Sequence, residues 1–245
     1  MIVRTIKRIA RKGIEALGYD VSLKPTQPQN ARQNYVLQTI EQKRVNVVLD
    51  IGANSGQFAA SLRKRGYRGR IVSYEPLSNA FEQLSLISAD DSQWTVVNEA
   101  VGAESGQADI NVSKNSWSSS FLTIEPLALA AEPSVAVVGK ELVRVTTLDR
   151  VCATHLFQGD VAFLKLDVQG FESSILQAAP TEVERFVAVI SETSLCRHYT
   201  NEWRIQDLII FFDLHGFDPV DINDAFREPR SGQLIQVDVL FHRRP

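Results

Sequence analysis

From residue 45 onward, short apolar segments alternate with segments that have the spacing of amphipathic helices. The apolar segments are rich in β-branched residues and almost uninterrupted by polar ones, which is typical of parallel strands covered by helices on both faces. We expect strands at residues 45–50, 70–75, 94–101, 161–167 and 186–192. The alternation predicts an α/β domain with a doubly wound, mostly parallel sheet.

The segments around these strands carry the start and stop signals of helices. Residues 56–66 follow a glycine loop, end in three basic residues and stop at a glycine, so they predict the first helix of the domain. Residues 77–89 predict a second helix, and residues 201–216 predict another near the C-terminus. The apolar segments 217–222 and 236–244 then predict a closing pair of strands.

Two parts of the chain depart from this alternation. Residues 103–143 are rich in Ser, Gly and Asn, which indicates an inserted hairpin and loop. Residues 2–17 combine apolar residues at helical spacing with five basic ones, and the polar segment 24–34 contains two prolines. We therefore predict a basic amphipathic helix and linker over residues 1–34, followed by a main domain over residues 35–245.

Composition narrows the expected partners and compartment. The formal net charge of −3 disfavours sequence-independent binding of nucleic acid. The two cysteines, Cys152 and Cys196, suit a reducing compartment and argue against structural zinc. No sequence segment approaches the ~18 consecutive apolar residues of a membrane span, so we expect a cytoplasmic protein. The N-terminal helix then either packs against the main domain or makes peripheral contact with anionic lipid through residues 2–17.

The first predicted strand leads into a glycine loop, with the sequence VLDIGANSGQF over residues 48–58. A Gly-x-Gly-x-x-Gly turn accommodates a dinucleotide pyrophosphate because its second glycine has no side chain, but Asn54 occupies that position here. The loop therefore suits a nucleoside ligand without a pyrophosphate. The helix N-terminus after Gly56 favours a carboxylate, and Asp50 favours an ammonium group.

A second acid completes this pattern, because Glu75 ends the next strand, 25 residues after Asp50. An acid about 20 residues beyond such a loop typically accepts the two hydroxyls of a ribose. Asp50, Gly52, Asn54, Gly56 and Glu75 together describe a site for adenosine joined to an amino-acid tail. S-adenosylmethionine has this chemistry.

An ordered set of motifs carries a family resemblance. The motifs VVLDIGANSGQF, SYEP, NEAVG, TLD, FLKLDVQGFE and QVDVLF resemble those of the FkbM family of methyltransferases over about residues 45–243. The resemblance implies a Rossmann-like class I methyltransferase domain, with a seven-stranded sheet that contains one antiparallel strand, and S-adenosylmethionine as its cofactor. The family often has Asp-Val-Glu-Gly where this chain has DVQG at residues 167–170, which argues against a charged role for position 169.

The resemblance also implies which residues contact the cofactor. The glycine loop would border the methionine part, Glu75 the ribose, and the turn after the third strand the adenine. The implied cofactor-binding residues are Asp50, Gly52, Ala53, Asn54, Gly56, Phe58, Glu75, Pro76, Glu99, Ala100 and Val101.

Methyl transfer to an alcohol requires removal of the hydroxyl proton, so we expect a general base at the strand ends, where ligands bind in open α/β sheets. Asp167 is the first candidate, Glu192 the second and the nearby His198 the third. The Asn-Pro-Pro-Tyr loop typical of nitrogen-methylating DNA enzymes does not follow the fourth strand. Structural roles are the alternatives: Asp167 capping the next turn, Glu192 pairing with an arginine, and His198 exposed on a helix.

Further candidates suit an acceptor molecule. Lys165 lies on the same strand face as Asp167 and would neutralise a carboxylate or anchor the substrate. The insert segment KNSWSSSF offers Trp117 for stacking on a sugar, and its candidate hydrogen-bonding residues are Asn115, Ser118, Ser119 and Ser120. The alternative for this segment is a flexible surface loop. No cluster of oxygen ligands with metal-binding spacing occurs, so we predict no required metal.

These observations predict an S-adenosylmethionine-dependent O-methyltransferase acting on a hydroxyl of a sugar, glycolipid precursor or polyketide-type metabolite. The acceptor class comes mainly from the family resemblance. Two alternatives are a nicotinamide-dependent oxidoreductase and an inactive, membrane-associated scaffold with a methyltransferase fold. The number of subunits is not predicted.

Overall fold

The computed structural model describes residues 29–245. The chain divides into two compact units, residues 1–35 and 36–245, and the second contains the fold described below. The basic helix predicted within residues 2–17 lies outside the described residues. Helix α2 (Gln29–Gln42) begins inside the segment predicted as a linker, so the linker prediction is wrong from residue 29 onward. None of the helices in residues 29–245 is long and apolar enough to cross a membrane.

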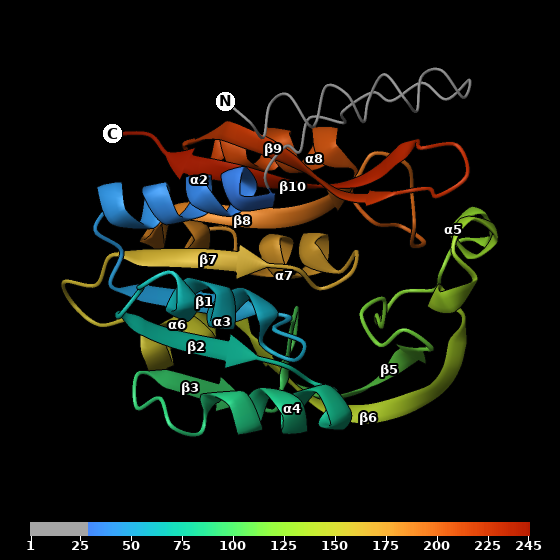
Figure 1. Cartoon of the computed structure of the whole chain (residues 1–245), viewed down its shortest axis with the longest axis horizontal. Coiled ribbons are helices and arrows are strands. Elements are labelled where there is room, and N and C mark those ends of the chain that lie inside the picture. Colours follow the sequence, from blue (N-terminus) through green and yellow to red (C-terminus); the bar gives the residue numbers. More distant parts are fainter. Residues whose placement is uncertain (1–28) are drawn as a thin grey trace, which may run out of the picture. The chain divides into compact units, whose positions relative to one another are not determined.

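A seven-stranded sheet forms the centre of the fold, in the order β3–β2–β1–β7–β8–β10–β9 (Figure 1). Its strands are β1 (Val47–Ile51), β2 (Arg70–Tyr74), β3 (Trp94–Val97), β7 (Ala162–Leu166), β8 (Phe186–Ser194), β9 (Phe217–Arg227) and β10 (Leu234–Arg243). Strands β3, β2, β1, β7 and β8 pair in parallel, whereas β10 is antiparallel to both of its neighbours. The predicted mostly parallel sheet with one antiparallel strand is confirmed.

Helices cover both faces of this sheet (Figure 1). They are α3 (Gln57–Lys64), α4 (Ser78–Ser88), α6 (Leu148–His155), α7 (Glu172–Ala178), α8 (Ile205–Leu214) and the short 3₁₀ turn η2 (Glu182–Arg185). Strand β1 is buried along its whole length. Its Val48 joins an apolar cluster with α2, α3 and α4, and its Leu49 joins another with α6, α7 and α8. The continuous apolar character of the strand follows from burial on both faces.

The strand predicted at residues 94–101 is in fact two strands in different sheets. The chain bends after β3, and Asn98 holds the bend because its side-chain amide donates to the carbonyl oxygens of Glu75 and Pro76, both at 3.0 Å. Strand β4 (Ala100–Gly102) then joins a separate three-stranded sheet. The sequence does not reveal such a bend, since both halves are largely apolar.

The insert supplies the rest of the smaller sheet. Strands β5 (Gly106–Ser113) and β6 (Val137–Thr147) pair antiparallel, with β6 between β4 and β5. Between them lie a loop, helix α5 (Pro126–Ala131) and the 3₁₀ turn η1 (Pro133–Val135). The insert stands beyond the carboxyl ends of β1, β2 and β7 (Figure 1). Ligands of open α/β sheets bind at this edge.

Candidate active site

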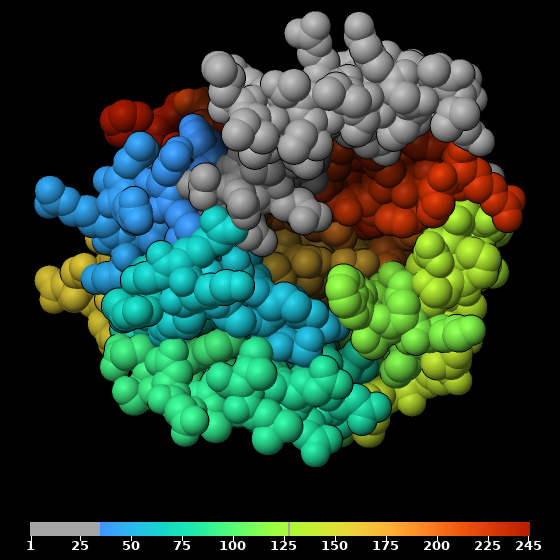
Figure 2. All heavy atoms as spheres, viewed as in Figure 1, coloured from blue at the N-terminus to red at the C-terminus, as the bar shows by residue number. Residues whose placement is uncertain are grey.

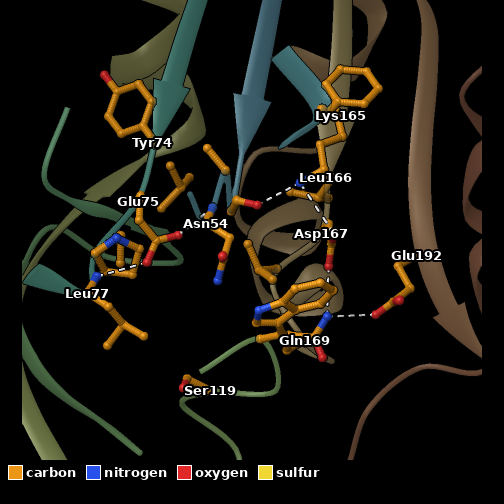
Figure 3. A pocket seen from close by; sticks show the side chains of 18 of the residues that line it. Asn54, Tyr74, Glu75, Leu77, Ser119, Lys165, Leu166, Asp167, Gln169 and Glu192 are labelled. Atoms are coloured by element: carbon orange, nitrogen blue, oxygen red, sulfur yellow. Dashed lines mark hydrogen bonds and ion pairs between the residues drawn. The ribbon is translucent and has the colours of Figure 1, made fainter. Parts of the chain in front are cut away.

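A cavity of 410 Å³ lies between the carboxyl ends of the central strands and the insert. Figure 2 shows the surface hollowed beside the insert, which is coloured green, and Figure 3 shows the polar side chains inside. Fourteen of the predicted site residues line the cavity: Gly52, Ala53, Asn54, Phe58, Glu75, Pro76, Glu99, Ala100, Val101, Trp117, Ser119, Lys165, Asp167 and Glu192. The structure therefore brings the predicted cofactor loop, strand-end acids and insert to one place.

The glycine loop after β1 touches the loop after β7. Gly52 has a φ of +75°, and a Cβ atom there would lie 1.8 Å from the backbone oxygen of Asp167. Only glycine permits this approach, because any side chain would collide with backbone that cannot move independently. A side chain at Gly56 is disfavoured by a different contact, since its Cβ would lie 2.6 Å from Ile87 of α4. Gly56 does not line the cavity.

Gly52→Ala is expected to destabilise the fold by roughly 2–4 kcal/mol, from backbone strain together with the collision at Asp167. Gly232→Ala is the matched control, since Gly232 has a similar φ of +73° but no atom within 4 Å of its Cβ position. Urea unfolding of both variants measures the difference. Equal losses of stability in the two variants would contradict the close approach of the two loops.

Glu75 is the candidate ribose-binding residue, and its carboxylate is fixed by the backbone. The N–H groups of Asn54 and Leu77 donate to its two oxygens, at 2.8 and 2.9 Å (Figure 3). Each oxygen accepts one of these bonds and keeps the capacity for another, which fits two ribose hydroxyls. Burial raises the pKa of Glu75 to about 7, although the two backbone bonds oppose this effect.

This pKa predicts that the affinity for S-adenosylhomocysteine depends on pH. Above pH 7 the carboxylate of Glu75 is ionised and accepts both hydroxyls, whereas below pH 7 it becomes a neutral, weaker acceptor. The dissociation constant should therefore rise about tenfold from pH 8 to pH 6, measured by calorimetry. Glu75→Gln should bind more weakly and show no such change. A wild-type affinity that is constant over this range would refute the assignment.

Lys165 connects the two loops electrostatically. Its ammonium group donates to the carbonyl oxygen of Gly52 at 2.6 Å and lies 3.3 Å from Asp50 Oδ1. It also lies 3.4 Å from Asp167 Oδ2 (Figure 3). Burial opposes its charge, but the carboxylates of Asp167 and Asp50 hold the pKa of Lys165 above its ordinary value. Asp50 is fully buried behind the cavity wall, where Ser73 also donates to it. Its ammonium partner among the described residues is Lys165.

Gln169 joins the two strand-end acids, and the sequence analysis did not select it. Its amide nitrogen donates to Asp167 Oδ1 and to Glu192 Oε2, both at 2.8 Å. Asp238 of β10 also lines the cavity, as the cross-strand partner of Glu192. Burial, and then the carboxyl groups of Asp167 and Asp238, raise the pKa of Glu192 well above its ordinary range. A polar residue within the apolar segment QVDVLF was the available signal for Asp238.

His198, the third candidate base, lies outside the cavity lining. Its side chain is 3% exposed and packs against the rings of Tyr199 and Phe226, and this burial lowers its pKa. The interpretation as an exposed helix residue is also wrong. The neighbouring Tyr199 reaches the site instead, because its hydroxyl donates to Gln169 Oε1 at 3.0 Å.

Several polar residues of the insert hold its loop in place instead of lining the cavity. Asn115 accepts a hydrogen bond from the N–H of Ser118 at 3.0 Å and donates to the Ser134 hydroxyl at 3.2 Å. The Ser120 hydroxyl donates to the carbonyl oxygen of Gln169 at 2.7 Å. This arrangement leaves Trp117, whose side chain is 67% exposed, at the cavity, and substrate contacts through the loop stay a prediction.

Within residues 29–245, no group of three or more His, Cys, Asp or Glu side chains is arranged to hold a metal ion. The expectation that no metal is required stays a prediction.

The sheet order, the glycine loop and the candidate ribose-binding acid are those of a class I S-adenosylmethionine-dependent methyltransferase. The family model described as "Methyltransferase FkbM domain" matches residues 50–226. The chain belongs to the FkbM methyltransferase family. A search of curated proteins finds no match.

Solved structures with a similar fold are distant in sequence. TehB from Haemophilus influenzae is 9% identical with a TM-score of 0.49, over 86% of this chain and 62% of that one. A TehB-like S-adenosylmethionine-dependent methyltransferase from Corynebacterium glutamicum is 12% identical with a TM-score of 0.43, over 100% of both chains. Magnesium protoporphyrin IX methyltransferase from Synechocystis, with bound S-adenosylmethionine, is 11% identical with a TM-score of 0.45, over 92% and 87%.

Proposed function

We propose that this methyltransferase modifies a hydroxyl group of a sugar, glycolipid precursor or polyketide-type metabolite, with Asp167 as the general base. The observation that carries the proposal is the position of Asp167. Its backbone oxygen packs against Gly52 of the glycine loop, and its side chain lines the same cavity as Glu75. A base at this point lies between the donor loop and the remaining space of the cavity.

Three segments of the cavity wall suit the three parts of S-adenosylmethionine. Glu75 would accept the ribose hydroxyls, Glu99 to Val101 would border the adenine, and the glycine loop would contact the methionine part; residues of all three segments line the cavity. When bound, S-adenosylmethionine supplies an electrophilic methyl group on a sulfonium sulfur. The side chain of Asp167 then orients the acceptor hydroxyl and accepts its proton. Much of the rate comes from holding the acceptor in line with the methyl group.

The acceptor side of the cavity is the part that lies beyond the glycine loop. Its charged groups favour an acceptor without a charge of its own. Three carboxyl groups line it, from Asp167, Glu192 and Asp238. The ammonium group of Lys165 is the lining cation there, and it is already engaged with Asp50 and Asp167. Acidic walls repel phosphate and carboxylate groups but hydrogen-bond well to hydroxyls. We propose that Trp117 and Ser119 complete the site, with the indole stacked on a sugar face.

The alternatives from the sequence have weaker support. Family membership argues against a nicotinamide-dependent oxidoreductase and against a role as a scaffold alone. A cytoplasmic location with peripheral contact to anionic membrane through residues 2–17 stays a proposal. Flotation of the full chain and of a chain lacking residues 1–20 with anionic vesicles tests that contact.

Transfer of a labelled methyl group tests the proposed function. The protein is incubated with S-adenosylmethionine carrying a ¹³C-methyl group and with matched acceptors: neutral glycosides, their phosphate esters and the corresponding amino sugars. NMR of the products distinguishes O-methyl from N-methyl groups. We expect O-methylation of a neutral hydroxylated acceptor and none of its phosphate ester. An N-methylated product or a preference for phosphate esters would overturn the proposal.

A further inference from the structure

The loop after β7 contains an amide that cross-links the two acids of the acceptor side. Both hydrogens of the Gln169 amide nitrogen are used, one on Asp167 and one on Glu192, each at 2.8 Å (Figure 3). Gln169 has a φ of +56°, a conformation uncommon for residues other than glycine, asparagine and aspartate. Backbone strain of this kind persists only where surrounding contacts hold it.

Tyr199 fixes which way this amide faces. Its hydroxyl lies 3.0 Å from Gln169 Oε1 and 3.1 Å from the carbonyl oxygen of Ser118, and these two acceptors share its one hydrogen. The oxygen of the amide therefore faces Tyr199, and the nitrogen faces the two acids. Tyr199 is fully buried, and burial raises its pKa, which keeps the hydroxyl a neutral donor. Gly170 permits the packing, because a Cβ there would lie 2.8 Å from the Tyr199 ring. A reversed amide would turn its oxygen toward two carboxyl groups.

The cross-link leaves one oxygen of Glu192 for the acceptor. Glu192 Oε2 accepts from Gln169 at 2.8 Å and from the Gln236 amide at 3.1 Å. No hydrogen-bond partner of Glu192 Oε1 occurs among residues 29–245, and Glu192 lines the cavity. An oxygen that accepts two N–H bonds has the character of a carbonyl oxygen, so a proton on this carboxyl group resides on Oε1.

We propose that Gln169, oriented by Tyr199, is a positioning residue that holds Asp167 and Glu192 in different roles toward the acceptor. The Asp167 carboxylate, next to the Lys165 ammonium, accepts the proton of the reacting hydroxyl. The Glu192 carboxyl group, whose Oε2 is held by the amides of Gln169 and Gln236, presents Oε1 to a second oxygen of the acceptor. Active sites often contain two carboxyl groups that take different roles because their environments differ. The inference rests on the proposed hydroxyl acceptor.

Other charged groups also face this pair of acids. Those of the surrounding elements are Asp50 on β1, Lys165 on β7, Glu172 on α7 and Asp238 on β10. These charged groups are unchanged in the Gln169 and Tyr199 variants below. A change in the titration midpoint of Glu192 therefore reports on the Gln169 amide.

The test measures the titration of Glu192 directly, by NMR of the carboxyl carbons of protein labelled with ¹³C-glutamate and bound to S-adenosylhomocysteine. The resonance is assigned by its loss in Glu192→Gln. Amide donation favours the ionised carboxylate, so Gln169→Met should raise the titration midpoint by about one pH unit. Tyr199→Phe should also raise it, because the amide then loses the hydroxyl contact that holds it against the two acids.

The two substitutions form a double-mutant cycle. In the Gln169→Met background there is no amide to orient, so adding Tyr199→Phe should cause no further shift. Equal shifts from Tyr199→Phe in both backgrounds would show a general structural effect and overturn the role in orientation. Gln107→Met is the control, an identical change at an exposed position of β5, and should leave the midpoint unchanged.

An unchanged midpoint in Gln169→Met would overturn the proposal. If that variant does not fold, the titration midpoint of Glu192 in Tyr199→Phe, which removes a single oxygen atom, tests the proposal instead. An unchanged midpoint there would overturn it. The titration uses neither acceptor nor turnover, so its failure is distinct from that of the proposed function. An N-methylated product would refute the hydroxyl acceptor and leave the midpoint shifts in place.

Discussion

Asp167→Asn is expected to lower kcat by roughly 10²–10⁴-fold, because the acceptor hydroxyl loses the group that accepts its proton. The affinity for S-adenosylhomocysteine should change less than about threefold, since Lys165 keeps its contacts with Asp50 and the Gly52 carbonyl oxygen. Single-turnover transfer of a labelled methyl group, together with calorimetry, measures the two quantities separately.

Asp90→Asn is the matched control, at an exposed position after α4, and should retain full activity. Glu192→Gln is a useful comparison, because an amide of the same size can still form a hydrogen bond with the acceptor. It should reduce kcat less than Asp167→Asn does. A larger loss in Glu192→Gln, with Asp167→Asn active, would transfer the role of general base to Glu192.

Lys165→Met is expected to destabilise the fold by about 3–5 kcal/mol, because removing one partner of a buried ion pair leaves the other charge without compensation. Asp50 is fully buried, and its Oδ1 lies 3.3 Å from the Lys165 ammonium. Urea unfolding at neutral pH, followed by circular dichroism, measures the loss.

Removing both charges should restore most of this stability. Asp50→Asn combined with Lys165→Met leaves neutral groups in the same volume, and such replacements are often nearly neutral. Burial already raises the pKa of Asp50, and this effect grows when Lys165 is absent. A raised pKa makes the protonated, folded form more favourable at low pH. The deficit of Lys165→Met should therefore be smaller at pH 5 than at pH 8, and a deficit independent of pH would contradict this origin.

The central strands could be predicted because their residues report burial directly. Strand β1 is apolar without interruption since helices cover both of its faces, and the glycine loop marks its end. The bend at Asn98 could not be predicted in the same way. Its two hydrogen bonds reach the carbonyl oxygens of Glu75 and Pro76, which are distant in the chain.

In the candidate site, too, the features that depend on contacts between residues distant in the chain could not be predicted. Asp167 and Glu192 were predicted because carboxyl groups at strand ends are recognisable one residue at a time. Gln169 and Tyr199 act through each other and through long-range contacts, and Asp238 faces Glu192 only because of the register between β10 and β8. His198 shared the sequence neighbourhood of the site, but the direction of a side chain in a loop depends on tertiary packing.

A crystal structure with S-adenosylhomocysteine tests the central claim most directly. We expect the ribose hydroxyls on the carboxylate of Glu75. The sulfur should lie at most about 8 Å from the Asp167 carboxylate, which leaves room for one methyl group and one acceptor oxygen between them. A ribose that does not contact Glu75, or a sulfur that faces away from Asp167, would contradict the account.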